Sequence, residues 1–446
     1  MAVYPFLGMR GTGDWTDPTA RPGSYREKIL ELWPNGSAPL TAITSKTGRG
    51  QKLTDSKYTW KTRTLATQAG AVTAVYIDVS LVTAYVYATH QATIGIAGGT
   101  VHAKVAAATA AMFREGHKVI LRDSNHLEVD VRGKVVGVII NGASSVISVK
   151  LHEADDNGSV AASFNLATVD RIMVIGNINS QCGTRPRALR YDPVDVYNVT
   201  QIWRTPVELS GTALETTLRG RDAYIDEKQQ GLLYHGIEME KDLIWSVRTE
   251  GTGANGKPEN SIMGIIQFIT TYVPASVDDF SLNSDYIGKT WKEAGKNWLD
   301  AMIQTIYAVG SGELGSEVLA LCGGGAAAGI QQLVEANSMY TITEKTAAYG
   351  VRVLELRSIF GTIFLKIHPL LNFETTNAHT MLLVPPAAVR WLPLRDTHYK
   401  PDMLYDQGGA QGVDGKQEEY LTEGTYEYML DGPWGYLKGV GMDNAA

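Results

Sequence analysis

Residues 198–243 have the sequence NVTQIWRTPVELSGTALETTLRGRDAYIDEKQQGLLYHGIEMEKDL, whose periodicity changes near Arg221. The part up to Thr212 is rich in residues that favour strands and predicts extended structure. After Arg221, apolar residues recur at helical spacing, with charged residues on the other face. The helical pattern continues to about residue 250, where Gly251 and Gly253 are expected to end it. We therefore predict a strand followed by the longest helix of the chain.

The apolar face of this helix is expected to pack against the rest of the fold. Its predicted packing residues are Ile225, Leu232, Leu233, Ile237 and Ile244. The acidic cluster EMEKD at 238–242 could supply paired carboxylates for acid–base chemistry. On an amphipathic helix such a cluster is more often a solvated face with pairing between residues three apart. We therefore expect a structural helix.

Downstream, helical and extended patterns alternate over residues 262–394, which indicates a mixed α/β unit. Two helices are predicted, KTWKEAGKNWLDAMIQTIYAVG (289–310) and AAGIQQLVEAN (327–337). Four strands are predicted: EVLALC (317–322), GVRVLELRS (350–358), GTIFLKIH (361–368) and HTMLLVP (379–385). The last two runs, EEYLTEGTYEYML (418–430) and GPWGYLKGVG (432–441), are expected to form a strand pair.

Upstream, residues 115–155 hold four short β-branched runs separated by DSN, RGK and NGAS. These separators have turn chemistry, so the runs predict a small antiparallel β unit that closes near residues 170–178. Residues 86–113 are rich in alanine and fit either helix or strand.

The N-terminal stretch, residues 1–56, is rich in Gly, Pro, Ser and Thr. Such a composition buries little surface by itself, so we expect an arm that lies on something else. The adjoining segment from Lys46 to Arg63 carries six Lys or Arg residues and a single acid, Asp55. Its YTWKT run alternates in the manner of a strand. Because the whole chain has a formal net charge of −7, a segment this basic indicates a partner surface.

The length of 446 residues exceeds what one hydrophobic core usually covers and predicts two or three compact units. No apolar run approaches the ~18 residues of a membrane span, and the N-terminus does not look like a signal peptide. A soluble intracellular protein is expected. Cys182 and Cys322 lie far apart and indicate neither a disulfide framework nor a zinc site. The mild acidity argues against a dedicated nucleic-acid binder.

Two glycine-rich stretches were considered as nucleotide or anion sites. GSGELG (310–315) matches the dinucleotide fingerprint, but the segment before it is helical rather than a strand. LCGGGAAAG (321–329) runs from a strand into a helix without a following Lys-Ser or Lys-Thr pair, so close packing is the expected reason for its glycines. The nine histidines form no metal-binding spacing, and there is no GxSxG motif. We predict no catalytic residue, no cofactor and no metal.

Four motifs, taken in their order, resemble one family. They are PLTAITSKTGRGQKLTDSKYTWKTRTLA (39–66), the VELSGT strand that runs into a helix bearing Asp226, Glu227 and Gln230, SIMGIIQFITTYV (261–273), and the ending from His398 to Val440. With the arm, the strand-rich insertion and the long helix, they resemble tailed-bacteriophage major capsid proteins with the Hong Kong 97-like fold (podovirus/siphovirus major capsid family).

This resemblance implies an α+β capsid fold. Its parts would be an N-terminal arm (1–56), an extended loop (57–82 and 171–205), an inserted β-rich domain (83–170), a peripheral domain with the spine helix (206–261 and 395–446) and an axial domain (262–394). Lys52, Lys57, Lys61 and Arg63 are then candidates for contacts with an acidic surface of an adjacent subunit, although some of them could face packaged DNA.

The implied function is a major capsid protein that self-assembles into hexamers and pentamers of an icosahedral head shell. Portal, scaffolding and decoration proteins and non-specifically bound double-stranded DNA would be its partners, without a membrane. Assembly in the host cytoplasm and a final place in the virion would follow. An encapsulin-like nanocompartment shell protein, a cytosolic α/β nucleotide-binding enzyme and a phage tail or baseplate protein remain alternatives.

Overall fold

A computed structural model describes residues 50–63, 66–126, 130–155, 165–216, 222–309, 317–336, 342–346, 352–358, 360–401, 414–430 and 432–444. The chain divides into two compact units. We name residues 1–60 and 196–446 the body, and residues 61–195 the barrel unit. Strands β1 (Lys57–Thr62) and β8 (Val194–Val199) run between the two units and pair with each other.

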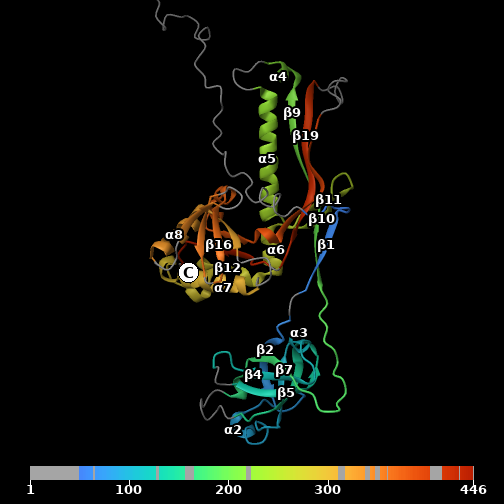
Figure 1. Cartoon of the computed structure of the whole chain (residues 1–446), viewed down its shortest axis with the longest axis vertical. Coiled ribbons are helices and arrows are strands. Elements are labelled where there is room, and N and C mark those ends of the chain that lie inside the picture. The colour runs from blue at the N-terminus through green and yellow to red at the C-terminus, as the bar shows by residue number, and fades with distance from the viewer. Residues whose placement is uncertain are drawn as a thin grey trace, which may run out of the picture. The chain divides into compact units, whose positions relative to one another are not determined.

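The barrel unit is a closed antiparallel barrel of six strands in the order β2-β3-β6-β5-β4-β7 (Figure 1). Its strands are β2 (Ala69–Tyr76), β3 (Thr100–Val105), β4 (His117–Arg122), β5 (Asp130–Ile139), β6 (Ser145–Leu151) and β7 (Arg171–Asn177). Short helices α2 (Tyr87–His90) and α3 (Ala107–Ala110) and the 3-10 turns η2 (Gly142–Ser144) and η4 (Leu166–Thr168) connect them. Alternate residues such as Val119, Val135 and Val149 fill a separate core inside the barrel. The unit therefore has a core of its own.

The barrel is longer in sequence than the β-rich insertion expected at 83–170. Strand β2 pairs with β3 on one side and with β7 on the other, and so closes the sheet. Residues 69–76 and 171–177 are therefore barrel strands, although the resemblance assigned them to the extended loop. The physical reason is that closure leaves no unpaired sheet edge. A fragment limited to residues 86–170 would lack two of the six strands.

The body contains a mixed seven-stranded sheet, a three-stranded antiparallel sheet and a two-stranded hairpin. The seven-stranded sheet has the order β12 (Val277–Asp279), β20 (Gly435–Lys438), β17 (Met381–Val384), β13 (Glu317–Cys322), β16 (Thr362–Ile367), β15 (Arg352–Arg357) and β14 (Ile342–Thr346). The three-stranded sheet has the order β18 (Val389–Lys400), β19 (Gly415–Tyr428) and β9 (Gln201–Ser210), and the hairpin joins β10 (Thr249–Thr252) to β11 (Pro258–Ser261). The combination of helices and sheets confirms the expected α+β class.

Helices cover both faces of the seven-stranded sheet. The main helices of the body are α4 (Gly211–Glu215), α5 (Ala223–Trp245), α6 (Ile265–Tyr272), α7 (Trp291–Val309) and α8 (Gly324–Ala336), and the 3-10 turns are Pro274–Ser276, Phe280–Leu282, Ser284–Tyr286, Pro369–Asn372, Thr375–Asn377 and Pro386–Ala388. Val318 of β13 packs in the core shared with α7 and α8, whereas its neighbour Leu319 packs in the core shared with α6. Strand β13 is thus buried on both faces, as its uninterrupted apolar sequence predicted.

The two final strands do not pair with each other, and the expected strand pair is wrong. Strand β19 is the centre of the three-stranded sheet, whereas β20 pairs with β17 and β12 of the seven-stranded sheet. The turn between β19 and β20 carries Trp434, whose side chain is buried in the core between the sheets. Burial of the apolar Trp434 side chain stabilises a connection that passes from one sheet to the other, instead of a tight hairpin within one sheet.

The C-terminal residues are fixed to the rest of the body. The Asn444 side chain is 1% exposed, and its amide donates hydrogen bonds to the carbonyls of Phe280 (2.9 Å) and Asn283 (2.8 Å). We expect Asn444→Ala to lower the free energy of unfolding by about 1–3 kcal/mol, because buried carbonyls lose their donor. Urea unfolding of unassembled subunits measures this, with Met442→Ala at an exposed neighbouring position as the control. Equal stability of the two variants would contradict the role of Asn444.

Candidate functional site

Helix α5 lies along β9 and β19 of the three-stranded sheet (Figure 1). Asp222 caps its first turn by accepting a hydrogen bond from the backbone N–H of Tyr224 (2.8 Å). Gly231 allows the close approach, because a Cβ at this position would lie 3.0 Å from Val207 on β9. The helix ends at Trp245, before the expected residue 250, because Ser246 is extended and leads into β10.

Polar side chains fill much of the contact between α5 and the sheet. The Tyr224 hydroxyl donates to Glu418 of β19 (2.6 Å) and accepts from Lys228 (3.1 Å) and Lys416 (3.0 Å). Burial and the Glu418 carboxylate raise the pKa of Tyr224, so this phenol stays protonated. One helical turn later, Tyr420 donates to the backbone carbonyl of Lys228 (3.1 Å). The first half of the helix is therefore held by hydrogen bonds more than by apolar packing.

His235 is buried in the middle of this contact. Its Nδ1 lies 2.9 Å from the Thr205 hydroxyl, and its Nε2 lies 2.7 Å from the Thr422 hydroxyl. Thr205 donates its own proton to Glu238 (3.2 Å), which leaves its oxygen free to accept from Nδ1–H. Nε2 then accepts from Thr422. Burial lowers the pKa of His235, in agreement with this neutral imidazole.

Acidification should therefore destabilise the body. Because burial lowers the pKa of His235, the unfolded chain binds a proton at this residue at a higher pH than the folded chain does. The contribution of neutral His235 to the stability of the fold is therefore complete above about pH 6.5 and is lost as the pH falls below this value. His102 and His117 of the barrel unit, whose pKa values burial also lowers, act with the same sign. We expect His235→Gln to flatten the dependence of unfolding free energy on pH between 6.5 and 5, whereas exposed His152→Gln should not. Identical slopes for wild type and His235→Gln would contradict this.

The C-terminal half of α5 carries a buried carboxylate. Glu240 and His368 are both fully buried, and His368 Nε2 lies 3.1 Å from Glu240 Oε1. Asp242 accepts hydrogen bonds from Gln201 (2.5 Å) and from the indole N–H of Trp203 (2.6 Å). The EMEKD cluster was expected to be a solvated face, and this is wrong for Glu240. His368 gives the buried Glu240 side chain a hydrogen-bonding partner.

The predicted packing residues of α5 divide between its two sides. Ile244 is fully buried, and Leu233 and Ile237 are partly buried. Ile225 and Leu232 are each 49% exposed and do not belong to the core of the single chain. The reason is the polar contact beneath the helix, where Gly231 and His235 occupy the positions that face the sheet.

The four basic candidates lie in and around β1. Lys57 Nζ is 3.8 Å from Glu250 Oε1 and 3.9 Å from the centre of the Tyr197 ring, and Lys61 Nζ is 3.5 Å from Asp195 Oδ1. Lys52 and Arg63 are exposed. The structure thus gives two of the four an acidic partner within their own chain, and all of these side chains remain largely open to solvent.

The face of the three-stranded sheet that points away from α5 carries glutamates of β19, because the alternate residues Glu418 and Thr422 point toward the helix. Glu419 binds Arg204 (2.6 Å) and Lys400 (3.1 Å), and Glu423 binds Arg395 (2.6 Å). Burial opposes ionisation of Glu419, but hydrogen bonds and charge from its two cations prevail and lower its pKa. These carboxylates have cations from the flanking strands and therefore act as cross-strand pairs.

The glycine-rich stretch 321–329 is used for packing, as expected. A Cβ on Gly323 would lie 2.3 Å from the Ala378 carbonyl oxygen, and one on Gly329 would lie 2.4 Å from Gly441. The N–H of Gly324 donates to Asn372 (2.6 Å), so it is not available to an anion. The other stretch, 310–315, lies outside the described residues. Burial raises the pKa of Cys322 to about 12, which makes this thiol unreactive.

Within the part of the chain that the structure describes, no cluster of His, Cys, Asp and Glu is placed to hold a metal ion. Among the same residues, no helix is long and apolar enough to span a bilayer. The candidate functional features of the described residues are therefore charged and apolar surfaces.

Comparison with known proteins gives a match over nearly the whole chain. A family profile described as "SU10 major capsid protein" matches residues 12–440. A protein named "Major capsid protein" from Pseudomonas phage PaMx41 is 24% identical over 415 residues, which cover 93% of this chain and 87% of that protein.

Two solved structures illustrate the range of similar folds. One, titled "Mycobacterium phage Bobi", aligns with a TM-score of 0.42 and 8% identity over 94% of this chain and 96% of its own. Another, the holo-SrpI encapsulin complex from Synechococcus elongatus PCC 7942, aligns with a TM-score of 0.38 and 11% identity over 56% of this chain and 76% of its own.

Proposed function

The chain belongs to the SU10 major capsid protein family, and from this premise we propose that many copies of it form hexamers and pentamers of a closed icosahedral shell around a phage genome. It is a structural protein and not an enzyme. The observation that carries the proposal is the extent of the family match, because residues 12–440 include both the body and the barrel unit.

The parts of the chain receive roles within that shell. Helix α5 with the three-stranded sheet would form the peripheral domain, and the seven-stranded sheet with its helices would form the axial domain near the capsomer centre. Strands β1 and β8 would belong to the extended loop, and residues 1–56 would form an arm that lies on neighbouring subunits. The exposed side chains of Ile225 and Leu232 lie seven residues apart and so on one face of α5, which is the face that would contact a neighbouring subunit.

The basic candidates Lys52, Lys57, Lys61 and Arg63 would contact acidic surfaces of an adjacent subunit. Their exposure supports this role, because each can exchange its present surroundings for a neighbour at little cost. Portal, scaffolding and decoration proteins and the packaged DNA are further proposed partners. Assembly would take place in the host cytoplasm, and the finished shell would be part of the virion.

Electron microscopy of the overexpressed protein tests the proposal. Closed shells are expected, whereas only tubes, rings or dispersed monomers would contradict it. The family match makes the encapsulin-like alternative less favoured than a phage capsid. The contents of particles from infected cells separate the two, since a capsid should contain phage DNA and a nanocompartment a cargo enzyme.

A further inference from the structure

Three lysines lie side by side on the outside of the barrel. Lys118 of β4 is directly opposite Lys134 of β5, and Lys134 is directly opposite Lys150 of β6. Their sequence neighbours Val119, Val135 and Val149 are fully buried in the barrel core, so the lysines project outward. We name these three residues the lysine row.

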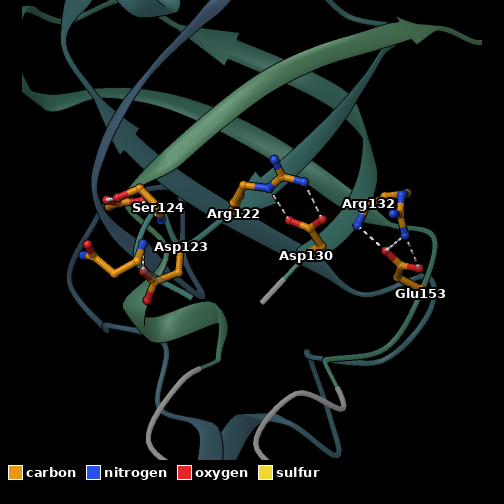
Figure 2. A network of polar contacts seen from close by, with 8 residues as sticks. Arg122, Asp123, Ser124, Asp130, Arg132 and Glu153 are labelled. Atoms are coloured by element: carbon orange, nitrogen blue, oxygen red, sulfur yellow. Dashed lines mark hydrogen bonds and ion pairs between the residues drawn. The ribbon is translucent and has the colours of Figure 1, made fainter. Parts of the chain in front are cut away.

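Like charges directly opposite each other on neighbouring strands are destabilising. No carboxylate of the described residues lies within ion-pair distance of the lysine row. The arginines of the same face are different. Arg122 forms a bidentate pair with Asp130 (2.6 Å for both bonds), and Arg132 binds Glu153 through its backbone N–H (2.6 Å) and its guanidinium (3.3 Å), as Figure 2 shows. Among its described residues, the barrel thus supplies carboxylates to Arg122 and Arg132 but none to the lysine row.

The charges of the chain are divided between its two units. Residues 61–195 contain 13 Lys or Arg and 11 Asp or Glu, which leaves the barrel unit with a net charge of +2. The remaining residues contain 27 Lys or Arg and 36 Asp or Glu, which leaves the body with a net charge of −9. The lysine row, which has no carboxylate partner among the described residues, and an acidic body occur in the same chain, and a shell repeats both in every copy.

We propose that the lysine row docks on an acidic surface of the body of a second copy of this chain. The inference rests on the proposed shell function and names the partner of one surface within it. Charge complementarity indicates a second copy, because the body of each copy carries a net charge of −9 and is present wherever the chain assembles. Contact between copies would supply carboxylates to the lysine row and would offset the repulsion within the row.

Zero-length crosslinking of assembled shells tests the contact directly. Shells are assembled from an equal mixture of ¹⁴N- and ¹⁵N-labelled full-length chains, treated with a carbodiimide, and analysed by mass spectrometry. Peptides with Lys118, Lys134 or Lys150 should be joined to Asp or Glu peptides of residues 196–446, with mixed isotopes in about half of the pairs if the two copies mix at random. Absence of such pairs, or pairs of one isotope only, would overturn the proposal.

Matched variants test the function of the contact. The triple change of Lys118, Lys134 and Lys150 to Glu should reduce the yield of shells about tenfold or more, while the triple change to Arg keeps the charge and should assemble as wild type. Circular dichroism and urea unfolding of the unassembled subunits show whether each variant folds. The Glu variant replaces one row of like charges by another in the same register, so the unassembled subunit should fold with a stability similar to that of wild type.

The possible failures are distinguishable. If wild type forms no shells, the proposed function itself is wrong. If wild type forms shells and the folded Glu variant forms them equally well, the lysine row is not a contact between copies. If those shells are normal but lose DNA, the row serves nucleic acid, and the proposal is overturned in favour of that partner.

Discussion

Replacing His368 by Ala should lower the free energy of unfolding by about 3–5 kcal/mol, because it leaves a cavity and removes the hydrogen-bonding partner of a buried carboxyl group. Glu240 and His368 have no exposed side-chain surface. His368 Nδ1 accepts a hydrogen bond from the N–H of Leu370 (3.2 Å), so its proton lies on Nε2, which faces Glu240. The bond joins α5 to the segment that follows β16, and its loss should loosen the attachment of the long helix to the seven-stranded sheet.

Three variants make this expectation specific. Glu240→Gln keeps an oxygen that can accept from His368 and leaves no cavity, so it should cost less than His368→Ala. His398→Ala removes an exposed histidine and should change stability by no more than about 0.5 kcal/mol. Urea unfolding of unassembled subunits measures all three. A loss at His368→Ala as small as at His398→Ala would show that Glu240 obtains its stabilisation elsewhere.

The sequence predicted the elements of the body better than their contacts. Helices α5, α7 and α8 and strands β13, β15, β16 and β17 follow from periodicity, because long apolar patterns determine element type locally. The pairing of β19 and β20 could not be derived in this way, since it depends on which sheet buries Trp434. Partners distant in sequence are decided by packing, which a local pattern does not contain.

The phase of α5 illustrates the same limit. Ile225 and Leu232 were the obvious packing residues, yet Gly231 and His235 face the sheet. The signal that could have found this face was the threonine-rich sequence of the opposing strands, because Thr205 and Thr422 provide hydrogen-bonding partners for a buried imidazole. An apolar helix face predicts that the face is buried, but it does not tell whether the covering surface belongs to the same chain or to another subunit.

The lysine row could not be predicted from the sequence, because it also depends on contacts between residues that are distant along the chain. Its members are 16 residues apart along the chain, and only the register of β4, β5 and β6 brings them together. The basic segment around β1, by contrast, was plain from composition. What composition could not provide was its intramolecular partners, Glu250 and Asp195.

Reversing Lys52, Lys57, Lys61 and Arg63 to Glu should leave a folded subunit that does not assemble. The ion pairs of Lys57 and Lys61 join side chains that are 47–68% exposed, and pairs of this kind contribute at most about 1 kcal/mol each. The reversed residues would repel Glu250 and Asp195 locally, so a quadruple change to Gln is the matched control for charge loss without repulsion.

Assembly responds differently from folding, because each subunit of a symmetric shell repeats the altered contact and small penalties add over the whole particle. We expect no closed particles from the Glu variant, fewer from the Gln variant and a normal yield from a variant with Lys52, Lys57 and Lys61 changed to Arg, as counted by electron microscopy and sedimentation. Salt should weaken wild-type assembly only in part, because screening acts mainly on exposed pairs. If the Gln variant assembles like wild type, the four charges are not needed for contacts between subunits. If the Glu variant forms normal shells that lack DNA, the basic strand faces the genome and not the neighbouring subunit.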